Sequence, residues 1–281
     1  MLFRSLDQPA VHHFMAIERP DYIFIAAAKV GGILANSTQR ADFIYQNLMI
    51  AANIVHAAYQ AGVPRLMFLG SSCIYPRECP QPIKEEYLLN GALEPTNDAY
   101  AIAKIAGIKI CEAFNHQHGT RYMAAMPTNL YGPGDNYDLA TSHVMPALIR
   151  KVHEARENGI SKVIVWGTGA PRREFLYCDD LADACVFLME KNDEFLAGCE
   201  GRSPFINVGC GADVTIHELA HEVGDVLGYQ GRFEFDTSKP DGTPVKRLDV
   251  SRLTNLGWQP KVSLRDGIRQ AYEDFLRRER K

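Results

Sequence analysis

The sequence predicts an α/β fold in which helices cover a parallel sheet. Strand-like and helix-like segments alternate along the chain, which is typical of parallel sheets whose strands are joined by helices. Hydrophobic residues make up 46% of the 281 residues, enough for a sizeable core. No internal repeat or low-complexity tract interrupts the alternation. Together these observations favour a nucleotide-binding domain followed by a smaller, mixed substrate domain.

The first half of the chain alternates regularly. The expected elements are a strand over 22–28, a helix over 40–61, a strand over 65–70, a helix over 96–118 and a strand over 121–127. The second helix has Thr96 or Asn97 as its expected N-cap, since both residue types accept hydrogen bonds from the first turn.

From about residue 136 the rhythm loosens. The expected elements are a helix over 143–155, a strand over 162–167, a helix over 178–191, a strand over 205–209, an amphipathic helix over 215–229 and an edge strand over 232–235. We therefore predict a cofactor domain over 1–135, with 172–192 returning to it, and a predominantly substrate-binding domain over 136–281.

Charge and cysteine content exclude several classes of protein. The net charge is −4 and the isoelectric point is about 6.1, with no basic stripe, which argues against a nucleic-acid partner. The seven cysteines are odd in number and include no Cys-x-x-Cys, which favours reduced thiols over a disulfide scaffold. No signal peptide or membrane-spanning run is evident. We expect a soluble, cytoplasmic protein with no membrane partner.

Tyr100 and Lys104 form the first candidate pair for chemistry. They are four residues apart in a helical stretch, so they lie on one helix face. A free phenol titrates near about 10, and a neighbouring ammonium is expected to lower that pKa. Tyr-x-x-x-Lys is common, however, and the plain alternative is a buried tyrosine beside a surface lysine.

Two further stretches strengthen the pair. Ser71, Ser72 and Cys73 follow strand 65–70 directly, and "PTNLYGP" leaves strand 121–127 at the same edge of the sheet. Sheets of this class bind ligands at the carboxyl ends of their strands. Hydroxyl groups of Ser71 and Tyr100 can both hydrogen-bond a substrate oxygen. The pattern predicts a carbonyl-reducing site that uses a nucleotide cofactor.

Seven stretches carry a resemblance to a known family. They are "AAAKVGGILAN", "DFIYQNLMI", "FLGSSCIYP", "LEPTNDAYAIAKIAG", "MPTNLYGPGDN", "SHVMPALIRK" and "KPDGTPVKRLDVSRL". The chain resembles the extended short-chain dehydrogenase/reductases over essentially its whole length. Within them it is similar to the enzymes that epimerise and reduce GDP-4-keto-6-deoxy-D-mannose to GDP-L-fucose. The resemblance implies a Rossmann-like, doubly wound sheet and a homodimer that pairs through helices 40–61 and 96–118.

The same resemblance implies NADP(H) as the cofactor. The residues that it assigns to cofactor binding are Leu69, Gly70, Ser71, Ser72, Lys104, Pro127, Thr128, Asn129, Leu130 and His143. The choice of NADP over NAD comes from the family alone, because the residue that meets the ribose 2′ position lies at the end of a strand that this chain does not contain.

The remaining roles are also implied by the resemblance. Cys73 and His143 match the acid/base pair that inverts the two carbons flanking the 4-keto group, and Tyr100 supplies the proton for reduction. The plain alternatives are a small buried thiol for Cys73 and a helix N-terminal residue for His143. The matches for GDP-sugar contacts are Lys151, Trp166, Arg173 and Asp241. Lys151 stands where relatives can carry arginine, and Trp166 is nearly as compatible with a core position.

The family normally opens with a strand and a glycine-rich turn that cradles the cofactor pyrophosphate. Here the first glycine is Gly31, so the chain is expected to lack one β-α-β unit of roughly 30 residues. We expect residues 1–281 alone to be poorly soluble or inactive, without micromolar affinity for NADPH. An upstream reading frame that encodes this unit would indicate a misplaced start or a fragment, and a stop codon a real loss.

Three other functions were weighed. His217, Glu218 and His221 have the His-Glu-x-x-His spacing of zinc hydrolases, but Leu227 stands where a third histidine is needed, and packing of an amphipathic helix explains the stretch. A nucleotide-sugar 4,6-dehydratase would carry an acidic pair after the active-site serine, whereas no carboxylate occurs here before Glu78. A cofactor-deficient, non-catalytic relative that acts as a binding protein remains the main alternative.

Overall fold

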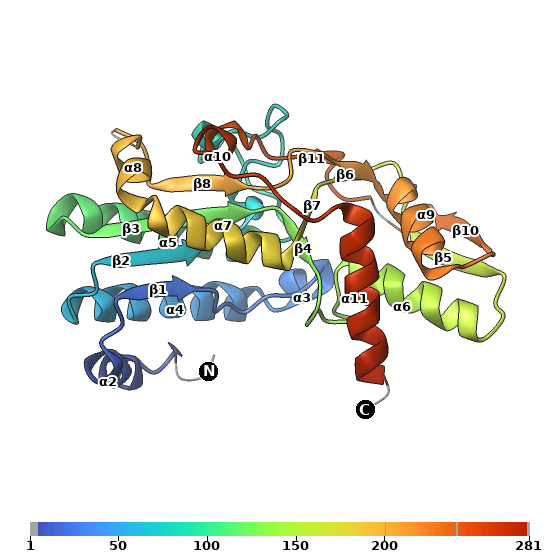
Figure 1. Ribbon diagram of the computed structural model, residues 1–281, viewed down its shortest axis with the longest axis horizontal. Coiled ribbons are helices and arrows are strands. Elements are labelled where there is room, and N and C mark those ends of the chain that lie inside the picture. Colours follow the sequence, from blue (N-terminus) through green and yellow to red (C-terminus); the bar gives the residue numbers. More distant parts are fainter. Residues whose placement is uncertain (1–4, 200, 240, 280–281) are drawn as a thin grey trace.

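The computed structural model describes residues 5–199, 201–239 and 241–279. A parallel sheet with helices on both faces forms one end of the molecule, and a smaller group of helices and short strands forms the other (Figure 1). The arrangement confirms the predicted α/β class and the doubly wound sheet.

The main sheet has four strands in the order β1-β2-β3-β8, and every neighbouring pair is parallel. These strands are β1 (Tyr22–Ile25), β2 (Arg65–Leu69), β3 (Arg121–Pro127) and β8 (Phe205–Val208). β3 is buried almost throughout, as expected for a central strand covered on both faces. Because all four strands run the same way, their carboxyl ends share one edge.

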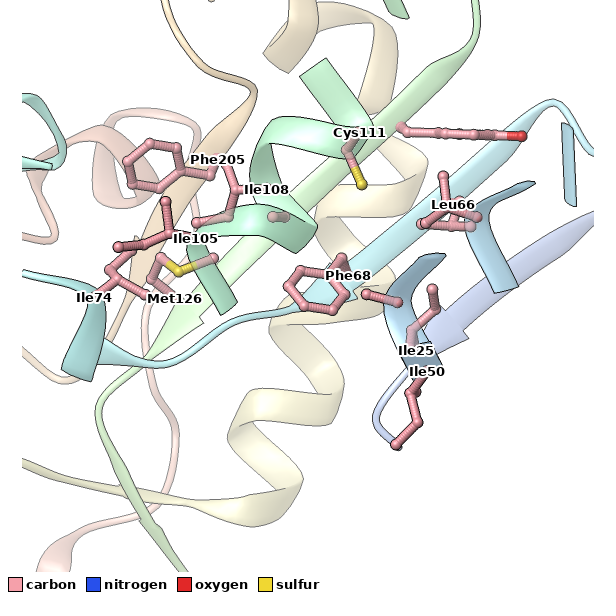
Figure 2. Close-up of a cluster of buried hydrophobic side chains, with 14 of the residues drawn as sticks. Ile25, Ile50, Leu66, Phe68, Ile74, Ile105, Ile108, Cys111, Met126 and Phe205 are labelled. Carbon is pink, nitrogen blue, oxygen red and sulfur yellow. The ribbon is translucent and has the colours of Figure 1, made fainter. Parts of the chain in front are cut away.

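One face of the sheet packs against two long helices, α4 (Arg40–Gln60) and α5 (Asp98–His118). Leu66 and Phe68 of β2 point to this face, where they meet Ile50 of α4 and Ile105 and Ile108 of α5 (Figure 2). The short helix α2 (Gln8–Glu18) packs on α4, and α3 (Ile33–Thr38) precedes α4. α4 and α5 therefore supply the first covering layer.

The opposite face is covered by α7 (Cys178–Glu190), with α8 (Asn192–Ala197) and α10 (Ser251–Asn255) beside it. Met67 and Met123, which alternate with the residues of the first face, pack there with Leu181 and Leu188 of α7. The 178–190 segment thus returns to the first domain, within the 172–192 stretch assigned to it from the sequence.

The smaller part is built around a parallel pair, β5 (Lys162–Trp166) and β10 (Arg232–Asp236). Three helices pack with it: α6 (Val144–Glu157), α9 (Ile216–Leu227) and α11 (Leu264–Glu279). β10 pairs only with β5 among the described strands, which confirms the edge strand predicted over 232–235.

Short strands join the two parts. β4 (Asn129–Tyr131) pairs with β7 (Phe175–Tyr177), and β6 (Arg172–Arg173) lies between β11 (Val245–Lys246) and β9 (Val214–Thr215). Two 3₁₀ turns complete the elements, η1 (Ser72–Ile74) and η2 (Glu85–Tyr87). Segment 172–177 therefore belongs to both parts of the molecule.

Several details differ from the sequence-based expectation. β8 joins the main sheet although it lies within 136–281, because its four buried residues pair with the free side of β3. Asn97 is the N-cap residue of α5, but its side chain makes no capping hydrogen bond. Its amide points to Cys73 instead.

The His-Glu-x-x-His helix has an ordinary packing role. His217 and His221 are exposed on α9, where their rings lie against Phe235 and Phe233 of β10. Glu218 closes a capping box with Thr215, so its carboxylate is engaged at the helix N-terminus. Among the helices that the structure describes, none is long and apolar enough to cross a membrane.

Candidate active site

The carboxyl edge of the main sheet gathers three of the predicted residues. Ser71 follows β2 and is the N-cap of η1, where its hydroxyl accepts a hydrogen bond from the Cys73 amide at 3.3 Å. Tyr100 lies in the first turn of α5, and its phenol interacts with the Ser71 hydroxyl. The structure therefore brings two hydroxyl groups to one point of the edge.

Lys104 is held one turn further along α5. Its side chain is only 4% exposed, and Nζ donates to the Leu69 carbonyl at 2.7 Å. The ammonium also lies 4.8 Å from the Phe68 ring centroid and 5.7 Å from that of Tyr100. Burial lowers the pKa of Lys104 to about 8.

The expectation that Lys104 lowers the pKa of Tyr100 is wrong for this arrangement. Burial, and then the nearby Cys73, raise the pKa of Tyr100, while its hydrogen bond with Ser71 opposes them. The ammonium of Lys104 is directed to the Leu69 carbonyl, away from the phenol oxygen. Tyr100 consequently keeps its proton near neutral pH, and the raised pKa makes its phenol a weaker acid than a free tyrosine.

Cys73 is more than a small buried thiol. It is half-buried on η1, and its sulfur accepts a hydrogen bond from Asn97 Nδ2 at 3.4 Å. Lys246 Nζ lies 3.8 Å from the same sulfur. Asn97 and Lys246 thus both contact the Cys73 sulfur from elements other than η1.

Sequence reasoning missed Asn97 and Lys246. Both lie in stretches that carry the family resemblance, "LEPTNDAY" and "KPDGTPVKRLDV". Asn97 was considered only as a helix cap. No local pattern relates Lys246 to Cys73, because 173 positions separate them. Only the pairing of β11 with β6 brings the lysine to the sheet edge.

His143 is the N-cap residue of α6 and is exposed, without a capping hydrogen bond from its side chain. It lies near Asp135, whose pKa burial raises and His143 partly lowers again. Within the described residues no hydrogen bond joins His143 to Cys73. The two candidate acid/base groups thus come from separate elements, η1 and the start of α6.

Polar atoms without partners point to a ligand between these elements. Asn97 Oδ1 and Ser142 Oγ are buried and have no hydrogen-bond partner within the described part of the chain. Asn97 contacts the Cys73 sulfur, and Ser142 directly precedes His143 in the sequence. Buried polar atoms left open in this way are costly unless a ligand or water satisfies them.

Eight of the ten residues assigned to the cofactor lie at the ends of β2 and β3, whereas Lys104 is on α5 and His143 is the N-cap of α6. Thr128 and Asn129 are fixed at the end of β3, since Thr128 Oγ1 and Asn129 Nδ2 both donate to the Glu174 carbonyl, at 3.1 and 2.9 Å. One N–H group of the Lys104 ammonium donates to the Leu69 carbonyl, and the ammonium has further N–H donors. This set of amides, hydroxyls and an ammonium fits the ribose and carboxamide of a nicotinamide nucleotide.

The residues assigned to the GDP-sugar gather in the smaller part. Trp166, at the end of β5, is 66% exposed, so the core interpretation of this side chain is wrong. Lys151 Nζ and Lys239 Nζ lie 5.8 and 5.6 Å from its ring centroid. Sequence reasoning missed Lys239. Both ammonium groups lie over this exposed ring, and an aromatic ring with cations beside it can take part in binding a nucleotide diphosphate.

Arg173 and Asp241 flank this group. Arg173 is half-buried, and its Nη1 donates to the Thr243 carbonyl at 2.6 Å. Asp241 accepts hydrogen bonds from the amide and hydroxyl of Thr168, at 2.9 and 2.6 Å. Loops after β5 and before β11 are therefore tied together beside Trp166.

The chain is similar to known proteins over most of its length. The model of the NAD dependent epimerase/dehydratase family matches residues 3–209. The chain is 56% identical to GDP-L-fucose synthase 1 of Arabidopsis thaliana over 270 residues, which is 96% of this chain and 81% of that protein. It is 56% identical to GDP-L-fucose synthase of Escherichia coli K12 over 272 residues, 96% of this chain and 85% of that protein.

A solved structure extends the comparison to three dimensions. The chain superposes on a GDP-mannoheptose C4 reductase from Campylobacter jejuni, solved with NADP bound, with a TM-score of 0.89 and 39% identity. The superposition covers 97% of this chain and 86% of the other.

Proposed function

The chain belongs to the NAD-dependent epimerase/dehydratase family and, within it, to the GDP-L-fucose synthases, and from this premise we propose its reaction. The protein inverts C3 and C5 of GDP-4-keto-6-deoxy-D-mannose and then reduces C4 with NADPH to give GDP-L-fucose. One observation carries the proposal: Ser71 and Tyr100 share a sheet edge with a thiol that faces an ammonium group.

The reducing half rests on Tyr100, Ser71 and Lys104. NADPH, when bound, supplies the hydride for C4. The Tyr100 hydroxyl gives its proton to the C4 oxygen, and the Ser71 hydroxyl holds that oxygen in place. Lys104, with donors to spare beyond Leu69, binds the nicotinamide ribose. Thr128 and Asn129, fixed on the Glu174 carbonyl, border the nicotinamide.

The inverting half rests on Cys73 and His143. The 4-keto group acidifies the protons at C3 and C5, so one group that removes a proton and another that returns it on the opposite face can invert both carbons. Cys73, whose sulfur is contacted by Lys246 and Asn97, is the group assigned as the base. His143, exposed at the start of α6, is the group that returns the proton.

The GDP end of the substrate is assigned to the smaller part. The ring of Trp166 offers a face for the guanine, and Lys151 and Lys239 bind the diphosphate. Arg173 and Asp241 complete the group beside them.

The competing reactions fit the site less well. A dehydratase needs a carboxylate at the position of Cys73, where this chain has a thiol beside Lys246. A C4 reductase without inversion would have no use for that thiol and ammonium. A non-catalytic binding protein would have no need of a tyrosine that keeps its proton beside an open sheet edge.

Two further properties belong to this proposal. The protein acts as a homodimer, since Tyr45 of α4 and Ile102 of α5 are 62% and 45% exposed on neighbouring helices. It works in the cytoplasm, since seven cysteines without a disulfide suit a reducing compartment.

The test is to identify the product. The protein, carrying a glycine-rich β-α-β unit ahead of residue 1 and supplied with GDP-4-keto-6-deoxy-D-mannose and NADPH, should yield a 6-deoxy sugar whose nuclear magnetic resonance couplings show the L-galacto configuration. A product reduced at C4 with C3 and C5 unchanged would identify a simple reductase. Substrate binding without NADPH oxidation would identify the non-catalytic alternative.

A further inference from the structure

Glu174 is a fully buried carboxylate at the junction of the two parts of the molecule. Its exposure is 0%, and it lies between β6 and β7. Oε1 accepts from the Gly211 amide at 2.7 Å, and Oε2 accepts from the Leu248 amide at 2.8 Å. Burial raises the pKa of this carboxyl, and the backbone amides oppose that effect.

The backbone around Glu174 pairs with two functional segments. Just before it, Arg173 pairs with Lys246 in β6–β11. Just after it, Phe175 pairs with Asn129 in β7–β4. The Glu174 carbonyl accepts from Thr128 and Asn129, while its side chain bonds the Leu248 amide, two residues beyond Lys246.

The carboxylate therefore extends the ladder that places Lys246. β6 and β11 pair over only two residues each, a short contact for a strand that must present an ammonium accurately. The bond to Leu248 adds a third point of attachment to the same segment. The carboxylate is also packed closely against Gly209. A Cβ at that position would lie 2.2 Å from Glu174 Oε1, so only glycine fits there.

We infer that Glu174 is a positioning residue whose side chain holds β11 so that Lys246 stays beside the Cys73 thiol. Its side chain serves the inverting half of the site, and its carbonyl serves the segment with Thr128 and Asn129. The Thr128 hydroxyl also interacts with the carboxylate. A side-chain substitution should then disturb Cys73, while the bonds of Thr128 and Asn129 to the Glu174 backbone carbonyl stay in place. The link to epimerisation rests on the proposed function, whereas the link from Glu174 to Cys73 does not.

The first test needs no substrate. Iodoacetamide reacts with the thiolate, so its rate at Cys73, followed by mass spectrometry of the Cys73 peptide, reports the ammonium beside the sulfur. Glu174→Gln presents an amide NH₂ to one of the two backbone N–H groups and loses that bond. We expect Glu174→Gln and Lys246→Met each to slow alkylation of Cys73 by about tenfold.

The double variant decides whether one residue acts through the other. If Glu174 works by placing Lys246, the Glu174→Gln/Lys246→Met protein should react no more slowly than Lys246→Met alone, within about twofold. Slowing by the product of the two single effects would overturn the inference. A wild-type rate in Glu174→Gln would also overturn it.

A matched control separates placement from general loss of stability. Asp180 is likewise buried, at 2% exposure, and accepts from two backbone amides, those of Lys261 and Val262 at 3.1 and 3.0 Å. Asp180→Asn should lower the melting temperature as Glu174→Gln does, yet leave alkylation of Cys73 unchanged. Equal slowing in Asp180→Asn would overturn the inference. If Glu174→Gln does not fold, Glu174→Asp, which is too short to reach both amides, takes its place with the same expected result.

A second readout extends the test to the reaction. Exchange of the substrate C3 and C5 protons with D₂O should slow about tenfold in Glu174→Gln, with NADPH affinity within about twofold of the wild type. NADPH affinity that falls as much as exchange would overturn the division between side chain and carbonyl. A different result would separate the two proposals. If Glu174→Gln slows alkylation of Cys73 but the wild type itself exchanges no C3 or C5 protons, Glu174 still positions Lys246 and the proposed function is refuted.

Discussion

At the scale of single residues, protonation states assign the roles. Burial raises the pKa of Tyr100, so its phenol holds a proton to give to a substrate oxygen. Tyr100→Phe should cut reduction at C4 about 10²-fold or more, because a general acid is lost. Substrate affinity should change little, and Tyr59→Phe, in the last turn of α4, should be neutral. NADPH oxidation at saturating substrate measures this, and near-normal turnover would remove Tyr100 from the reaction.

Lys104 makes the reaction pH-dependent. Its pKa is about 8 in the folded protein, against about 10.4 in an unfolded chain. The ammonium that binds ribose is therefore lost as pH rises through about 8. Since kcat/KM reports groups of the free enzyme, kcat/KM for NADPH should fall about tenfold per pH unit above that value.

The effect of rising pH on the free energy of unfolding has the opposite sign to its effect on kcat/KM. Between these two pKa values the unfolded chain binds more protons than the folded one, so the destabilisation caused by burying the Lys104 ammonium is greatest below about pH 8 and diminishes as pH rises. Lys104→Met should give a low and flat kcat/KM profile over the same range. An alkaline fall that persists unchanged in Lys104→Met would assign it to another group.

At the scale of elements, the end of β5 carries the nucleotide contact. Trp166→Ala should raise KM for the GDP-sugar about tenfold, with kcat within about twofold, because stacking acts on binding alone. The melting temperature should hardly change, since the ring is 66% exposed. Trp258 is the control: it is 4% exposed and donates to Asp183, so Trp258→Phe should lower the melting temperature and leave KM unchanged. Equal KM in both variants would exclude stacking on Trp166.

The long elements were predictable because each repeats its period often enough to be recognised. α4 and α5 fall within one or two residues of their expected ranges, as do β2 and β3. β4 and β7 have three residues each, too few to show a period. Their pairing depends on tertiary contacts, and with it the place of Glu174.

The site was predictable where its members are close in sequence. Ser71 and Cys73 share one turn, and Tyr100 and Lys104 share one helix face. Lys246 and Lys239 reach their places through β11 and the loop before it, which no local pattern relates to Cys73 or Trp166. The pKa of Tyr100 was predicted in the wrong direction because burial outweighs a cation that is bonded elsewhere.

At the scale of the whole molecule, the proposed dimer contact is assigned to the outer faces of α4 and α5. Ile102 and Tyr45 are exposed on these neighbouring helices, and burying them between two copies would stabilise the proposed dimer. Ile102→Glu should yield a monomer, because a charge would be buried in that interface. Sedimentation should give twice the 31.4 kDa of the chain for the wild type and 31.4 kDa for the variant. A monomeric wild type would contradict the assignment.

The two parts of the molecule meet where both halves of the reaction are proposed. Tyr100 and Ser71 come from the main sheet, whereas Lys246 and His143 come from the smaller part. The proposed site carries out two separable reactions, inversion through Cys73 and His143 and reduction through Tyr100.

Proton exchange in D₂O tests this claim most directly. Substrate is incubated with wild type, Cys73→Ser, His143→Asn and Tyr100→Phe, and deuterium at C3 and C5 is measured by nuclear magnetic resonance. The account predicts strong suppression of exchange in Cys73→Ser and His143→Asn, by about 10²-fold, and retained exchange in Tyr100→Phe. Undiminished deuterium incorporation in Cys73→Ser and His143→Asn, or its loss in Tyr100→Phe alone, would contradict the account.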